Sequence, residues 1–221
     1  MNKTELLNKL AADADERLVL ARVLDKLELT RQRNIPSHTC FLSPTQRVSA
    51  ESLLNACGHP KHLFFGGYEG AERTICVFLP DWQEEDVWLD SDCPIKALRC
   101  TWSNGTLSHR DFLGSLMGMG VAREKVGDIL VTSESADILV LDTVADFLLQ
   151  SWESAGRTRL HLQEVERSCI HVPQASTEEV RDTVSSLRLD AVIAAGLRMS
   201  RGKAAELVSS GRVQVNWMEC T

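Results

Sequence analysis

Two cations follow a serine near the end of the sequence, a combination that favours phosphate binding. Ser200, Arg201 and Lys203 stand just before an apolar-periodic stretch, and this order predicts a helix capped by Ser200. A helix N-terminus presents unpaired N–H groups and partial positive charge, so cations in its first turn complete a phosphate site. The alternative is a solvated basic face on a small helical hairpin.

Charge is distributed unevenly along the chain. The 221 residues carry a formal net charge of -7, yet Leu187 to Trp217 carries +3, which leaves -10 for the rest. The five basic residues of this stretch are Arg188, Arg198, Arg201, Lys203 and Arg212. Because local charge decides what a surface attracts, the pattern predicts a basic module on an acidic body.

The elements that position these cations form a compact pattern. We expect a helix over Leu187–Ala195 that ends at Gly196, and a second helix from Ser200 to about Ser209. Gly211 suits the left-handed position after a helix, and residues 212–216 alternate as a strand. Residues 185–221 are therefore expected to form a helical hairpin followed by a strand.

The preceding residues predict an α+β protein. Residues 1–60 contain helical patterns, one ending near Asn34 before Pro36 and another opening at Pro44, which predicts an N-terminal helical domain. Residues 61–172 begin with two apolar runs around a Gly-rich connection at 66–70, a hairpin pattern.

From Ile95 the element order is β-α-β-β-α-β, which is typical of a ferredoxin-like or RRM-like domain. The polar residues 173–184 are expected to form a linker.

Composition disfavours several other classes of protein. The seven cysteines form no Cys-x-x-Cys, so we expect reduced thiols rather than a zinc or redox motif. Cys57, His59 and His62 would supply three metal ligands, but we identify no fourth, and no metal or cofactor is predicted. No apolar run reaches the length of a membrane helix, no secretory signal is recognised at Met1, and no small-molecule substrate is evident.

The end of the chain resembles the S4 RNA-binding domain. The resemblance rests on Arg-Leu-Asp at 188–190, Ser-Arg at 200–201 and Gly-Arg-Val-Gln-Val-Asn at 211–216. It implies that the two-helix face binds the phosphate backbone of structured RNA. The RNA-binding residues expected here are Arg188, Arg198, Ser200, Arg201, Lys203, Arg212 and Asn216. S4 domains normally continue with further strands, so we expect an incomplete module with a short sheet and an open edge.

The preceding motifs resemble the YlmH family over about Thr39 to Asn216. They are Phe41-Leu42-Ser43-Pro44, Gly66-Gly67-Tyr68-Glu69-Gly70-Ala71-Glu72-Arg73, Ser108-His109-Arg110-Asp111-Phe112-Leu113-Gly114 and Arg123-Glu124-Lys125-Val126-Gly127-Asp128-Ile129. The resemblance implies a cytoplasmic factor that binds rRNA and tRNA on the large ribosomal subunit, in the quality control of stalled peptidyl-tRNA complexes. Some relatives are discussed around cell division or photosystem assembly. Gln46 departs from the family, where an acidic residue is frequent.

Four further residues of the middle domain are RNA-binding candidates through this resemblance: His109, Arg110, Arg123 and Lys125. The alternative for the first two is helix capping and local ion pairing with Asp111. Tyr68 is either a base-stacking residue or an anchor of the hairpin connection.

Three functions remain open at this stage. The first is the non-catalytic RNA-binding factor described above. The second is an RNA-modifying enzyme, such as a pseudouridine synthase, that uses the S4 module as a tether; Asp128 and Asp137 are its catalytic candidates by position only. The third is a scaffold whose acidic body docks a basic partner.

Overall fold

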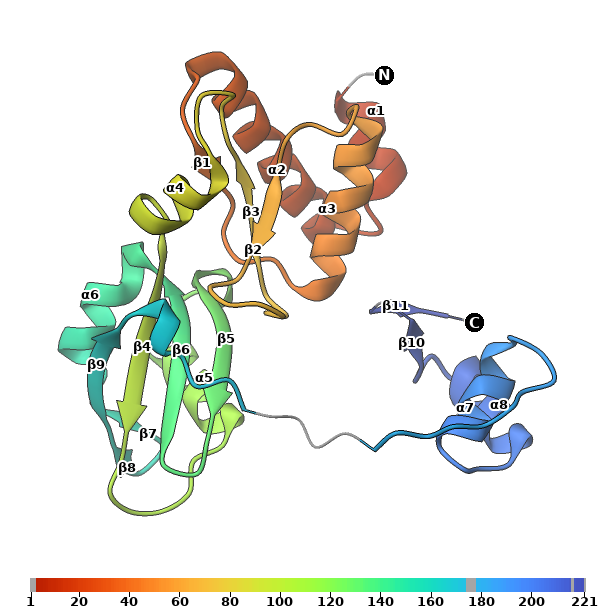
Figure 1. Ribbon diagram of the computed structural model, residues 1–221. Coiled ribbons are helices and arrows are strands. Elements are labelled where there is room, and N and C mark those ends of the chain that lie inside the picture. The colour runs from red at the N-terminus through yellow and green to blue at the C-terminus, as the bar shows by residue number, and fades with distance from the viewer. Residues whose placement is uncertain (1–2, 174–177, 216, 221) are drawn as a thin grey trace. The chain divides into compact units, whose positions relative to one another are not determined.

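The computed structural model of the chain describes residues 3–173, 178–215 and 217–220 (Figure 1). It divides into two compact units, residues 1–173 and residues 174–221. The finer division expected from the sequence, with boundaries at 60, 172 and 184, stays a prediction. Among the described residues, no helix combines the length and the apolar character that crossing a bilayer requires.

Three helices form the start of the first unit: α1 (Lys3–Leu10), α2 (Ala14–Arg33) and α3 (Pro44–Ala56). Asp13 caps α2 by accepting from Glu16 N, and Asn34 ends it in the left-handed conformation. Ser43 and Gln46 form a capping box at the start of α3, with Pro44 in the first turn. Gln46 thus has a structural role that its amide fulfils without a charge.

A three-stranded antiparallel sheet packs against these helices in the order β1 (Ser37–His38), β3 (Ile75–Phe78), β2 (Leu63–Phe65). The predicted hairpin is confirmed, and its Cys76 and Phe78 share a core with Leu20 and Leu53 of the helices. Two elements of this part were not predicted: the two-residue strand β1 and the acidic helix α4 (Glu85–Ser91).

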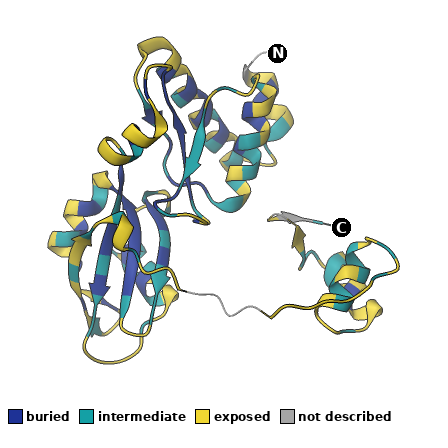
Figure 2. Ribbon diagram, in the orientation of Figure 1, coloured by how far each residue is buried: buried dark blue, intermediate teal, exposed yellow. Residues whose placement is uncertain are grey.

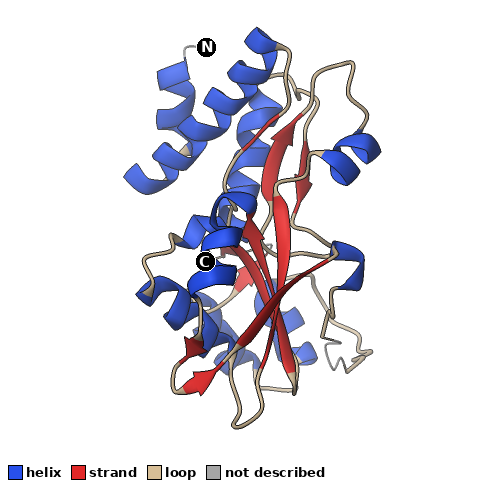
Figure 3. Ribbon diagram, turned by 90° about the vertical axis from the view of Figure 1, so that its left-hand side faces the viewer, coloured by secondary structure: helices blue, strands red, loops and turns tan. Residues whose placement is uncertain are grey.

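The middle sheet has the ferredoxin-like topology that the element order predicts. Its antiparallel strands lie in the order β5-β6-β4-β9, and two helices connect them. The elements are β4 (Ile95–Thr101), α5 (His109–Gly118), η1 (Arg123–Lys125), β5 (Val126–Val131), β6 (Ser135–Leu141), α6 (Asp142–Ser151) and β9 (His161–Val165), with the added small strands β7 (Ser154–Ala155) and β8 (Thr158–Arg159) and the turn η2 (Arg167–Cys169). The small sheet and the middle sheet follow one another along the unit (Figure 3).

The two central strands of the middle sheet, β4 and β6, are mostly buried (Figure 2). On one face, Leu98 and Ile138 pack against Phe112 of α5 and Leu148 of α6. On the other face, Ile95, Ala97, Leu139 and Leu141 pack against residues of the small sheet, including Ile75 and Val77. The small sheet and the middle sheet therefore share an apolar core.

The second unit contains a helical hairpin, α7 (Leu189–Gly196) and α8 (Arg201–Ser209), followed by β10 (Gln214–Val215). The helix expected from Leu187 begins two residues later, because Arg188 has the extended conformation of an N-cap. Gly211 has a φ of 68°, as its predicted role after α8 requires. A further strand, β11 (Met218–Glu219), pairs with β10 and was not predicted.

Candidate nucleic-acid interface

The first turn of α8 has the geometry of a phosphate site. The hydroxyl of Ser200 accepts a hydrogen bond from Lys203 N at 3.3 Å, so Ser200 is the N-cap. Arg201 and Lys203 are both exposed in this turn, and no neighbour stands within 4 Å of a Cβ at Gly202. The backbone of this turn is therefore accessible to an anion that approaches the helix end.

One carboxylate joins two of the predicted cations. Asp190 accepts from Arg188 Nε at 3.0 Å and from Arg201 Nε at 2.9 Å, through different oxygens. Hydrogen bonds from Arg201 and then Arg188 lower the pKa of Asp190 to about 2, so the carboxylate stays ionised in any physiological medium. The side chains of Arg188 and Arg201 remain 71% and 55% exposed, and together with Asp190 they carry one net positive charge.

Sequence reasoning missed this bridge, although Asp190 is part of the Arg-Leu-Asp motif at 188–190. The two arginines are 13 positions apart, and no helical or strand period connects them. The Nε atoms are engaged with Asp190, and the part of the chain that the structure describes contains no further hydrogen bond of either guanidinium. Their outer amino groups therefore stay available as donors to a phosphate.

The remaining candidates of the second unit are less tightly placed. Arg198 lies in the turn between the helices with a φ of 50°, and its Nη2 is 3.4 Å from Glu178 Oε1. Both side chains are at least 75% exposed, so this pair contributes little stability and can yield to a phosphate. Arg212 is exposed after α8. Asn216 lies outside the described residues.

The four candidates of the middle domain do not form one cluster. His109 and Arg110 are exposed in the first turn of α5, whereas Arg123 and Lys125 follow the other end of this helix, roughly 15 Å of helix away. Asp111 accepts from the backbone N and the hydroxyl of Ser108, so capping is observed; the first of these hydrogen bonds is 2.8 Å long.

Arg123 has a structural role in addition to any contact with RNA. Its Nη1 donates to Val126 O at 2.5 Å and Gly127 O at 3.3 Å, and burial lowers the pKa of its guanidinium. Phe41 N donates to Glu124 O at 2.9 Å, which ties η1 to the N-terminal part. A substitution at Arg123 would therefore disturb the fold as well as the charge.

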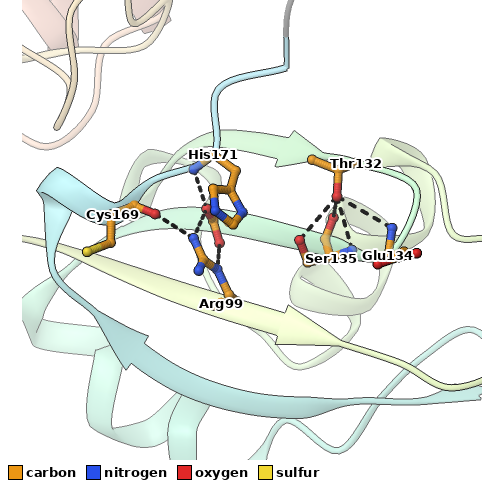
Figure 4. A network of polar contacts seen from close by, with 7 residues as sticks. Arg99, Thr132, Glu134, Ser135, Cys169 and His171 are labelled. Atoms are coloured by element: carbon orange, nitrogen blue, oxygen red, sulfur yellow. Dashed lines mark hydrogen bonds and ion pairs between the residues drawn. The ribbon is translucent and has the colours of Figure 1, made fainter.

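The second face of the middle sheet carries a polar pair beside its apolar residues. Beyond the residues that pack under the small sheet, this face carries Arg99 and Asp137, which form a two-point ion pair with both hydrogen bonds at 2.7 Å. Figure 4 shows that the segment 169–171 lies over this pair: Arg99 donates to Cys169 O at 2.6 Å, and His171 N donates to Asp137 at 2.7 Å.

The carboxylate of Asp128 joins the Gly-rich connection to the middle sheet. It accepts from the Tyr68 hydroxyl at 2.8 Å and from the backbone N atoms of Glu72 and Arg73 at 2.8 and 3.1 Å. Burial and the bond to Asp128 raise the pKa of the Tyr68 hydroxyl. Tyr68 is thus an anchor of the connection in this structure.

The two histidines among the suggested metal ligands have other partners. His62 contacts Pro60 O through Nδ1 at 2.7 Å and Glu51 through Nε2 at 3.3 Å, while His59 Nδ1 lies 2.6 Å from Asn55 Oδ1. Over the described ranges, no group of three or more His, Cys, Asp or Glu side chains has the arrangement of a metal site.

Comparison with known proteins supports the assignment of both RNA-binding parts. A family model described as the putative RNA-binding domain in YlmH matches residues 97–168, and the S4 domain model matches residues 187–221. Ribosome-associated protein quality control protein P2 of Bacillus subtilis (strain 168) is 33% identical over 205 residues, which are 92% of this chain and 78% of that protein. The chain belongs to the YlmH family.

A solved structure supports the fold of a YlmH protein independently. Cell division protein ylmH from Streptococcus pneumoniae matches with a TM-score of 0.58 and 21% identity, over 70% of this chain and 93% of that chain. At this identity the likeness concerns the fold alone. The two parts predicted from the sequence as RNA-binding, the middle domain and the S4 module, are the parts that the family models match.

Proposed function

We propose that the chain is a non-catalytic, cytoplasmic RNA-binding factor that engages rRNA and tRNA on the large ribosomal subunit, in the quality control of stalled peptidyl-tRNA complexes. Membership of the YlmH family and the name of the B. subtilis relative support the ribosomal setting. The two family models support RNA as the ligand.

The observation that carries the proposal is the first turn of α8. An open helix N-terminus, Lys203 and the two arginines on Asp190 present positive charge on a chain whose total is -7. Because the rest of the chain is acidic, only this local patch attracts a polyanion. Binding through the patch therefore fixes the orientation of the protein on RNA.

Two RNA-binding parts on one chain bind more strongly than either alone. Once the S4 module has bound, the chain holds the middle domain near the same RNA at a high effective concentration. A weak contact by His109 and Arg110 at the open end of α5 then adds affinity and selects RNAs that present both sites. This arrangement suits a large folded RNA such as rRNA better than a short single strand.

The alternative is an RNA-modifying enzyme. Its candidate carboxylates are Asp128 and Asp137, and each already has three hydrogen-bond donors from the protein. Asp137 is also 1% exposed. These partners support the non-catalytic role, because a nucleophile or base needs access to its substrate. Incubation with rRNA and tRNA followed by mass analysis of the nucleosides tests this directly, and a modified product would favour the alternative.

Charge reversal tests the RNA-binding surface. Arg201→Glu with Lys203→Glu should weaken binding to 23S-type rRNA fragments and reduce the magnitude of the slope of log K against log salt by about 2, roughly one unit per phosphate contact. Lys9→Glu with Arg31→Glu is the matched control, because it changes the net charge equally at exposed positions of α1 and α2. Equal losses in both variants would mean that only total charge matters and would contradict the assigned surface.

A further inference from the structure

The segment 81–92 combines negative charge with exposed aromatic surface. It contains six acidic residues and no basic one, and α4 lies inside it. Trp82 is 60% exposed, whereas Trp88 is 2% exposed and packs into the core beneath. Acidic runs are usually solvated faces, so the carboxylates alone indicate no ligand.

The exposed ring of Trp82 is held in place. Its Nε1 donates to Asn34 O at 3.0 Å. Asn34 is the left-handed residue that ends α2, so the acceptor belongs to a rigid helix end. An indole fixed in this way keeps a large apolar face toward solvent without losing further rotamer freedom on binding, which is the property of a recognition residue.

Trp82 forms one wall of a pocket of about 330 Å³, which we call the Trp82 pocket. The other walls are an aliphatic ring, an imidazole, a primary amide, a second indole and a carboxylate. The lining residues are Pro36, His38, Trp82, Gln83, Trp88 and Asp92.

Gln83 provides the second indication of a ligand, one that does not depend on the carboxylates. Its side chain is almost fully buried, with 4% of the residue exposed, and its Nε2 donates to Asp92 at 3.0 Å. Its Oε1 is buried and has no hydrogen-bond partner among the residues that the structure describes. A buried acceptor without a donor is costly, so this atom favours a ligand that brings an N–H group.

We propose that the Trp82 pocket binds the guanidinium of an arginine in a basic segment of a protein partner. An arginine stacks its planar cation on the indole of Trp82 and donates to Gln83 Oε1 and to the carboxylate of Asp92. A single arginine side chain thus supplies the missing donor to Gln83 Oε1 and neutralises the carboxylate of Asp92. The surrounding carboxylates attract a positively charged segment and repel RNA, which excludes base stacking on Trp82 as the role of this site.

The electrostatics at the floor of the pocket are compatible with a cation. Burial is the main cause that lowers the pKa of His38; Lys26 and Lys125 act in the same direction, while the bond to Thr39 O and Asp142 oppose them. The lowered pKa favours the neutral imidazole near pH 7. The ammonium group of the neighbouring Lys61 donates to the backbone O of Gln83 at 3.3 Å rather than to its side-chain amide.

This site is independent of the proposed RNA-binding surface. It uses none of the residues assigned to phosphate contacts, and Trp82→Ala should leave rRNA affinity and its salt slope unchanged. Failure of one proposal therefore leaves the other standing.

The test uses the full chain labelled with ¹⁵N and the peptide acetyl-Gly-Gly-Arg-Gly-Gly-amide. We expect saturable shifts of the Trp82 indole N–H and the Gln83 side-chain amide. The same peptide with citrulline, which has the shape of arginine without the charge, should cause none. Trp82→Ala should weaken binding roughly tenfold, as expected for loss of a cation–π contact and its wall.

Val87→Ala is the matched control, since Val87 is exposed on α4 within the same acidic segment 81–92 and both variants keep all six carboxylates. It should bind as the unchanged chain does. Asp92→Asn is a second variant that keeps the size of the side chain, and it should also weaken binding. Circular dichroism verifies that each variant is folded. Equal binding by Trp82→Ala and Val87→Ala, or equal binding of the citrulline peptide, would overturn the proposal and leave only general attraction to an acidic surface.

Discussion

The buried ion pair in the middle sheet supports a sharp prediction about stability. Asp137 has no exposed side-chain surface and accepts two bonds of 2.7 Å from Arg99, as well as one from His171 N. Asp137→Ala removes both acceptor oxygens, and with them all three hydrogen bonds. It leaves the Arg99 side chain, which is 15% exposed, with Cys169 O as its remaining partner. Breaking a buried pair costs about 3–5 kcal/mol, and the remaining bond of Arg99 favours the lower end of that range.

This energy corresponds to a measurable shift in melting temperature. For a unit of this size, about 1 kcal/mol shifts the melting temperature by roughly 2–4 °C, so we expect Asp137→Ala to melt roughly 6–12 °C lower. Residues 169–171 should also exchange their amide hydrogens faster, because His171 N loses its acceptor. The assays are urea and thermal unfolding followed by tryptophan fluorescence, together with hydrogen exchange read by mass spectrometry.

A matched control lies in the same strand. Lys96 and Glu164 form a pair at 2.8 Å in which both side chains are 43% exposed, so Lys96→Met should change stability by less than about 1 kcal/mol. Arg99→Met combined with Asp137→Leu should be more stable than Asp137→Ala alone, because no charge is left buried without a partner. A loss for Asp137→Ala no larger than that for Lys96→Met would refute the reasoning.

Two further predictions concern close packing and thiol chemistry. A Cβ at Gly127 would stand 2.7 Å from the ring of Phe41. Gly127→Val should therefore destabilise the first unit by at least about 2 kcal/mol, as measured by urea unfolding. Gly114 lies on α5, and a Cβ there would meet no neighbour within 4 Å, so Gly114→Ala should stabilise the unit slightly. Burial raises the pKa of the Cys100 thiol to about 12. At pH 8, iodoacetamide should therefore leave Cys100 unmodified in the folded chain and alkylate the exposed Cys169, which peptide mass analysis measures. Modification of both thiols at equal rates would contradict this packing.

Local features of the sequence predicted most of the fold. Ser43 with Pro44 predicted the start of α3, and Ser108 predicted the start of α5, because capping depends on neighbours in sequence. The alternation of period between Ile95 and Val165 predicted the ferredoxin-like order, and the strand order in the sheet follows from that. Strand β1 could not be predicted, because two residues contain no period and its pairing with β3 is a tertiary contact.

The candidate site was predictable in its residue types and only partly in its arrangement. Ser200 and Arg201 were placed at the start of α8, since an N-cap and a first-turn cation are local features. The bridge by Asp190 depends on how α7 packs against α8, which no spacing reveals. The same reason hid the Trp82 pocket, whose walls come from residues 36–38 and 82–92.

The central claim is that this chain binds ribosomal RNA and tRNA through an S4 module and a middle domain. Ultraviolet crosslinking of the tagged chain in cells, followed by mapping of the crosslinked nucleotides, tests this claim most directly. The account predicts crosslinks concentrated at one region of large-subunit rRNA and on tRNA, lost in Arg201→Glu with Lys203→Glu and kept in Trp82→Ala. Crosslinks spread over messenger RNA without enrichment on rRNA or tRNA would contradict it.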